Sequence, residues 1–340
     1  MLSRFRHTFF IALALSFSPC LAAQTQAAPP PAPSQEQQAP SDQEPVQTFK
    51  SQVNVVNLFF NVKDKHGMLI PNLAKEDFQV LEDGKPQAVK YFSAESNQPL
   101  TLGIMIDTSA SQTRVLEIEQ ESCAAFLRQV LRDKDLAFVI NFDVDVNLDQ
   151  DFTNNVRELT RALNKMQINA SISGGPPGLG GGPIPTTPRG TLLYDAIYLA
   201  ADEKLKNEVG RKAMIIFTDG EDQGSRLRIQ DAIEAAQKAD AICYVILIAD
   251  RGFYGGFGYS GDVDMRKLAE ATGGRVIEVG NKQEKLKQGF EQIQNELRSQ
   301  YNIGYTPTNS KLDGSYRKIQ IHAKDYKVQA RQGYYAIAKD

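Results

Sequence analysis

The chain has 340 residues, 41% of them apolar, which is enough to build one large domain or two ordinary ones. Its 38 basic and 41 acidic side chains give a formal net charge of −3, and the two signs are interspersed along the sequence. We therefore expect no nucleic-acid-binding surface and no surface attracted to anionic membranes.

Residues 1–23 have the pattern of a secretory signal peptide. Arg4 and Arg6 precede an apolar run from Phe9 to Phe17, and small residues follow. The pair Ser18-Pro19 is a poor match to the small residue that precedes a lipidated cysteine, which argues against anchoring through Cys20. No other apolar run of about 18 residues follows, so we expect no transmembrane helix after cleavage. The mature protein is expected to be exported, to the periplasm, the cell surface or the medium.

Two β-rich segments flank the middle of the chain. Residues 24–48 are rich in Gln, Ala, Pro and Ser and are interpreted as a disordered linker. Short apolar runs with Asp-Gly and Gly turns then predict antiparallel strands at 53–62, 78–81 and 89–92, and later at 302–305, 316–322 and 328–337. Because the N-terminal strands alone are too few for a stable sandwich, we predict one small discontinuous β-sandwich-like module made of residues 49–98 and 299–340.

Between these segments, residues 99–298 alternate between strand and helix patterns. Strands are predicted at 102–106, 136–142, 213–217, 242–248 and 276–279, and helices at 114–131, 156–166, 191–206, 228–239, 263–271 and 283–299. This alternation predicts an α/β domain with a doubly wound, mostly parallel, Rossmann-like sheet. We read Cys123 and Cys243, in apolar segments of this domain, as free core cysteines.

Five polar residues of this domain are expected to meet at one sheet edge. Asp107, Ser109 and Ser111 follow the first strand, Asp219 follows the third, and Thr191 begins a predicted helix. Ligands of doubly wound sheets bind beyond the carboxyl ends of the strands, and we expect Asp107 on an exposed strand end. The donors are hard oxygens, as Mg²⁺ prefers, with no His or Cys to suggest zinc. Since only two are carboxylates, a bound cation would keep positive charge and an open position for an acidic group.

The same segments resemble the metal-ion-dependent adhesion site of von Willebrand factor type A domains, over about 200 residues. The resemblance is carried by Asp-Thr-Ser-Ala-Ser at 107–111, Gly-Thr-Leu-Leu-Tyr-Asp-Ala at 190–196 and Ile-Ile-Phe-Thr-Asp-Gly-Glu-Asp at 215–222. The flanking segments 73–78, 81–85 and 331–335 are similar to features of the bacterial "VWFA-related" family.

The resemblance implies a metal ligated by Asp107, Ser109, Ser111, Thr191 and Asp219, with Asp219 acting through water. It implies Mg²⁺ or Mn²⁺, with Ca²⁺ ranked behind them, and a partner protein that presents an Asp or Glu. A degenerate site of the same fold that binds no metal remains the alternative.

Three functions stay open on this basis. The first is an exported, metal-dependent protein-binding or adhesion module with no catalytic residues. The second is a structural subunit of an envelope assembly that makes little use of the metal. The third is a magnesium-dependent phosphohydrolase in which Glu221 and Asp222 help to activate water. The alternative interpretation of these two residues is that they are solvated loop charges. The motif segments contain no Lys, Arg or His that could stabilise a phosphoryl charge or transfer protons. Loops 172–190 and 250–261 are interpreted as surface connections or contact surfaces, and the oligomeric state is left open.

Overall fold

The computed structural model describes residues 54–94, 98–169, 190–248, 261–280 and 282–337. The expected signal peptide and linker lie outside these residues, and so do the loops at 172–190 and 250–261 apart from Gly190 and Gly261. Among the helices that are described, none combines the length and the apolar character that crossing a membrane requires.

The centre of the chain forms an α/β domain around a six-stranded sheet with the strand order β10-β9-β8-β5-β6-β7. The strands are β5 (Leu100–Asp107), β6 (Leu136–Phe142), β7 (Val146–Thr153), β8 (Arg211–Thr218), β9 (Ala241–Leu247) and β10 (Arg275–Glu278). All neighbouring pairs are parallel except β6 and β7. Within this domain the chain begins at β5 and continues outward to β6 and β7 on one side. It then crosses to the other side of β5 and continues outward from β8 to β9 and β10, so β5 and β8 lie at the switch in strand order.

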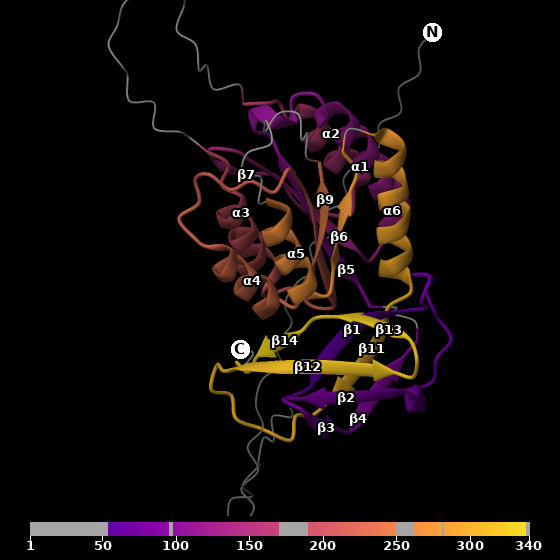
Figure 1. Cartoon of the computed structure of the whole chain (residues 1–340). Helices are drawn as coiled ribbons and strands as arrows, with labels where there is room; N and C mark the ends of the chain where they lie inside the picture. Colours follow the sequence, from indigo (N-terminus) through magenta and orange to yellow (C-terminus); the bar gives the residue numbers. More distant parts are fainter. Residues whose placement is uncertain (1–53, 95–97, 170–189, 249–260, 281, 338–340) are drawn as a thin grey trace, which may run out of the picture. The chain divides into compact units, whose positions relative to one another are not determined.

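Helices cover both faces of this sheet (Figure 1). One face packs against α1 (Leu116–Val130), α2 (Val156–Lys165) and α6 (Gln283–Arg298). The other packs against α3 (Leu193–Leu199), the π-helix η3 (Ala200–Leu205), α4 (Ile229–Lys238) and α5 (Gly261–Thr272). The two apolar clusters between helices and sheet make this the doubly wound fold that the sequence predicts.

The sequence of β5 explains its central position. All eight of its residues are buried, as expected for a parallel strand covered on both faces. Gly103 allows close packing there, because a Cβ at this position would lie 2.6 Å from the ring of Phe138 on the neighbouring strand β6. The strand thus carries Asp107, its last residue, to the carboxyl edge of the sheet inside a rigid core.

The two ends of the chain build a second, antiparallel module. Its sheets have the orders β13-β1-β11-β4 and β14-β12-β2-β3. The strands are β1 (Val56–Lys63), β2 (Phe78–Glu82), β3 (Lys85–Gln87), β4 (Val89–Ser93), β11 (Tyr301–Tyr305), β12 (Tyr316–Ala323), β13 (Lys327–Ala330) and β14 (Gly333–Tyr335). Each sheet contains strands from both ends of the chain, which alternate in the first sheet and lie as two adjacent pairs in the second, and the two sheets share one apolar cluster. The module is therefore discontinuous and sandwich-like, with the α/β domain inserted in it.

A buried polar network joins the two chain ends inside this module. Glu82 on β2 accepts hydrogen bonds from Tyr305 (2.7 Å) and Tyr334 (2.9 Å) and forms an ion pair with Arg317 at 3.3 Å. Glu82 and Arg317 are 3% and 1% exposed, so the pair is shielded from water. Such a pair fixes which strands meet more than it adds stability.

Several element predictions are corrected by the structure. The edge strand β7 was not predicted, because Gln150 interrupts its apolar alternation and none of its residues is fully buried. The predicted strand 328–337 is two strands, β13 and β14, which lie in different sheets. The helix predicted from Thr191 starts at Leu193 and continues as a π-helix. Cys123 and Cys243 are buried and free, as predicted.

Candidate metal centre

Asp107, the last residue of β5, is fully buried, and the prediction that it sits on an exposed strand end is wrong. Its Oδ1 accepts a hydrogen bond from the backbone N–H of Ser109 at 2.9 Å. Its Oδ2 accepts one from the hydroxyl of Thr218 at 3.0 Å. Both carboxylate oxygens are therefore held in a fixed direction by the ends of two neighbouring strands.

Ser109 and Ser111 bring their hydroxyls together just after Asp107. Ser109 precedes the short 3-10 helix η2 (Ala110–Gln112), whose turn returns Ser111 to the same side, and the two Oγ atoms lie 3.0 Å apart. Two neighbouring oxygens around an octahedral Mg²⁺, with bonds of about 2.1 Å, lie roughly 3.0 Å apart. The spacing of the hydroxyls thus fits two adjacent positions of such a shell.

Asp219 follows β8, the strand that pairs with β5 and places Phe217 beside Ile106. It is 2% exposed, and its Oδ1 accepts a hydrogen bond from the N–H of Glu221 at 3.0 Å. The next residue, Gly220, has φ +88°, a backbone conformation that glycine adopts without steric strain. A Cβ at this position would lie 2.8 Å from the backbone of Gly261. This turn keeps Asp219 at the sheet edge.

The two aspartates affect each other. Burial, followed by the negative charge of Asp219, raises the pKa of Asp107 to about 7, although hydrogen bonds from Ser109 and Thr218 oppose the change. Two carboxyl groups that share a buried edge repel one another when both are ionised. A cation bound between them would remove this repulsion.

The backbone around Thr191 is hydrogen-bonded to the loops that follow β6 and β8. Its carbonyl accepts a hydrogen bond from the N–H of Gln223, in the loop after β8, at 3.1 Å. The N–H of Leu192 donates to the carbonyl of Asp143, after β6, at 2.7 Å. Thr191 lies two residues before α3 and is partly exposed. The loop that carries it is thus tied to the loops after two strands of the sheet.

Other residues of this edge were missed in the sequence. The hydroxyl of Thr108 donates to Asp143 at 2.8 Å, and Asn169 bonds to both residues. Asp143 directly follows the predicted strand 136–142, just as Asp219 follows β8, so the same positional rule could have found it. These contacts hold the loop after β5 against the loop after β6.

Glu221 and Asp222 are not free loop charges. Asp222 is half-buried and accepts hydrogen bonds from the N–H of Tyr194 at 3.2 Å and from the hydroxyl of Ser225 at 2.5 Å. Glu221 accepts one from the N–H of Gly261 at 3.1 Å. Asp222 therefore stabilises the start of α3, whose first N–H groups have no partner within the helix.

The donor set fits a hard divalent cation. Within the described part of the chain, no group of three or more His, Cys, Asp and Glu side chains is placed to hold a metal. The Asp107 and Asp219 carboxylates would therefore need hydroxyls and water to complete a shell. Mg²⁺ binds in this way, through one or two carboxylates and several waters.

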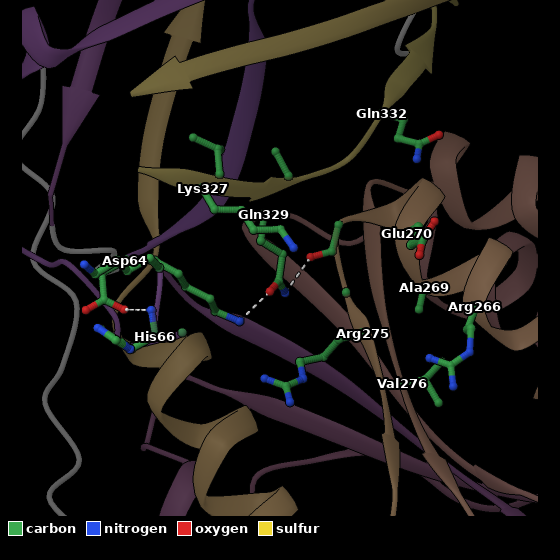
Figure 2. A pocket seen from close by; sticks show the side chains of 17 residues that line it. Asp64, His66, Arg266, Ala269, Glu270, Arg275, Val276, Lys327, Gln329 and Gln332 are labelled. Carbon is green, nitrogen blue, oxygen red and sulfur yellow. Dashed lines mark hydrogen bonds between the residues drawn. The ribbon is translucent and has the colours of Figure 1, made fainter. Parts of the chain in front are cut away.

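A cleft of about 770 Å³ lies elsewhere, between the α/β domain and the β module (Figure 2). Its lining includes Lys63 and Gln329 from the β module and Arg275 from β10, and none of the five predicted ligands. Lys63 donates to Gln329 at 2.6 Å, and Gln329 donates to the carbonyl of Gly273 at 3.1 Å. These polar groups serve to join the two parts of the chain.

No family model matches the chain, and no curated protein matches it. Among solved structures, the chain is similar to the conserved hypothetical protein BatB from Bacteroides thetaiotaomicron, with 18% identity, 58% of this chain and 98% of that chain covered, and a TM-score of 0.44. It is also similar to an aerotolerance-related membrane protein from Bacteroides fragilis, with 17% identity, the same coverage and a TM-score of 0.43.

A third similar structure is a von Willebrand factor type A protein from Catenulispora acidiphila, with 13% identity, 77% of this chain and 73% of that chain covered, and a TM-score of 0.45. The strand order is that of a doubly wound α/β domain, and it places the Asp-x-Ser-x-Ser segment at the carboxyl end of the central strand β5, where the resemblance to von Willebrand factor type A domains leads us to expect it.

Proposed function

We propose that the protein is an exported, divalent-metal-dependent protein-binding module, with Mg²⁺ or Mn²⁺ held at the carboxyl edge of β5 and β8. The observation that supports this proposal is that two serine hydroxyls 3.0 Å apart follow the buried Asp107, on which the charge of the buried Asp219 acts from the neighbouring strand. The expectation of export comes from the sequence pattern of residues 1–23.

The residues of the chain have distinct tasks in this proposal. Ser109 and Ser111 present hydroxyls, while Thr218 and the N–H of Ser109 orient Asp107. Asp219 adds negative charge from the next strand, and Thr191 supplies a hydroxyl from the loop before α3. The bound cation would offer an open, positively charged position to an Asp or Glu of a partner protein. Partner binding and metal binding must then strengthen each other equally.

Two measurements test the proposal. Calorimetry of the purified protein should show Mg²⁺ or Mn²⁺ binding in the micromolar to millimolar range, and Asp107→Asn should abolish it. Asp145→Asn, at an exposed position in the loop after β6, is the matched control and should leave it unchanged. Capture of a partner from an envelope extract should stop when chelator is added. Absence of metal binding at millimolar ion, together with capture that ignores chelator, would leave a structural envelope subunit as the function.

The enzymatic alternative gains little support. Asp222, one of its two candidate acids, is already engaged in stabilising the start of α3. Incubation with a panel of phosphate esters and Mg²⁺ tests it directly. Turnover that disappears in Asp107→Asn would replace the binding-module proposal with a hydrolase.

A further inference from the structure

Glu119 is a buried carboxylate without a described partner. It lies in the first turn of α1, is 1% exposed, and neither of its Oε atoms makes a hydrogen bond among the described residues. Its N–H is bonded normally to the carbonyl of Val115, so the helix itself is regular there. Buried polar atoms in folded proteins are almost always bonded, and an exception points to a water or an ion. An ionised carboxylate in such surroundings is unfavourable unless a charge or hydrogen bonds compensate it.

The position of Glu119 relates it to the metal centre. Helix α1 begins five residues after Ser111, and Glu119 occupies its core-facing side between Leu116 and Cys123. Burial, and then the negative charges of Asp107 and Asp219, raise the pKa of Glu119 well above its usual range. Its carboxyl group is therefore within electrostatic range of both aspartates. A second buried oxygen, Oε1 of Gln112 on η2, is also without a partner among the described residues.

Glu119 does not join the two aspartates as a direct ligand. The described residues contain no group of three acidic side chains close enough to hold one cation. An oxygen one water molecule away from a cation can still act on it, by accepting a hydrogen bond from a metal-bound water. Mg²⁺ keeps several waters when bound to protein, so such waters are available at this centre.

We propose that Glu119 is an outer residue of the metal centre, whose two buried oxygens accept hydrogen bonds from waters bound to the divalent cation. This inference rests on the proposed metal-binding function and extends it to a residue that the adhesion-site motif does not contain. The waters bound to the cation would donate hydrogen bonds to the carboxylate of Glu119. In return, the carboxylate would hold these waters in place. Residues in this role typically change metal affinity by about 10-fold to 100-fold when they are removed.

The test compares Glu119→Gln with the intact protein. Calorimetric titration with Mn²⁺ and with Mg²⁺ should show affinity about 10-fold or more weaker in the variant. Glu117→Gln, on the exposed side of the same helix, removes the same charge and should bind as the intact protein does. Thermal unfolding without metal gives a second measurement: Glu119→Gln should be at least as stable as the intact protein, because the substitution removes an unsatisfied buried carboxylate.

The outcomes separate this inference from the function on which it rests. If the intact protein binds neither ion, both are wrong. If the intact protein binds metal and Glu119→Gln binds it equally well, only the role of Glu119 is wrong. A second variant, Glu119→Leu, tests whether the carboxylate is needed for folding. It replaces the carboxylate with an apolar side chain of similar size in an apolar environment. A metal-free Glu119→Leu protein that is much less stable than the intact protein would show that the carboxylate has a structural partner and overturn the inference.

Discussion

Lys63 on β1 and Glu296 on α6 form an ion pair at 2.7 Å across the junction between the β module and the α/β domain. Their side chains are 12% and 2% exposed. Glu296 is also paired with Arg275 at 2.9 Å and accepts a hydrogen bond from Gln329 at 3.1 Å, while its carbonyl accepts one from Asn61 at 2.8 Å. The last turn of the last helix is thus anchored to three strands.

This relationship predicts that Glu296→Ala is strongly destabilising. Removing one member of a buried pair leaves the other charge without compensation and costs about 3 kcal/mol or more. Urea unfolding should show this loss. Glu291→Ala, at an exposed position on the same helix, should change the free energy of unfolding by less than about 0.5 kcal/mol. Equal effects of the two substitutions would contradict the anchoring role of Glu296.

The β module should require both chain ends. Among the strands that the structure describes, β1 pairs with β11 and β13, and β2 pairs with β12 on one side. A chain that ends at Ser299 loses all three partner strands and exposes the apolar faces of β1 and β2. We expect this chain to bind a hydrophobic dye or aggregate, whereas one that starts near Phe49 should fold like the mature protein. A chain ending at Ser299 with unchanged thermal stability would refute this.

Asp107→Asn should separate binding from stability. The amide keeps the shape of the side chain but removes the negative charge that a cation requires, so calorimetry should detect no Mg²⁺ at millimolar concentration. In the absence of metal, repulsion from Asp219 disappears, and the melting temperature should stay the same or rise. A variant that unfolds more easily than the intact metal-free protein would show that the two hydrogen bonds to Asp107 outweigh the repulsion.

Stability without metal should depend on pH in a defined direction. The pKa of Asp107 is raised from 3.8 to about 7 in the folded protein. Between these values the folded state holds a proton that the unfolded state releases, so this group favours folding at low pH and the benefit is lost as pH rises to 7. The melting temperature of the metal-free protein should therefore fall from pH 5 to pH 8. The fall should be smaller in Asp107→Asn, and an unchanged slope there would assign the effect to other groups.

Much of the architecture could be read from local sequence patterns. The predicted strand 136–142 coincides with β6, and helix 156–166 matches α2 within one residue, because each has a clear apolar period and a turn at its end. Where that period is interrupted, the prediction failed. The exposed strand β7 was not predicted, and Arg331 and Gln332 divide what looked like one strand into β13 and β14.

The sequence by itself determined the class of fold and the choice of candidate ligands, because strands followed by polar residues must deliver them to one edge of a parallel sheet. Only the tertiary structure decided the environment of those ligands. It buries Asp107, bonds it to Thr218 on the neighbouring strand, and places Glu119 within electrostatic range of both aspartates. Asp107 is more than a hundred residues away from Thr218 and Asp219 along the chain, so no local pattern contains the contact with the one or the repulsion from the other.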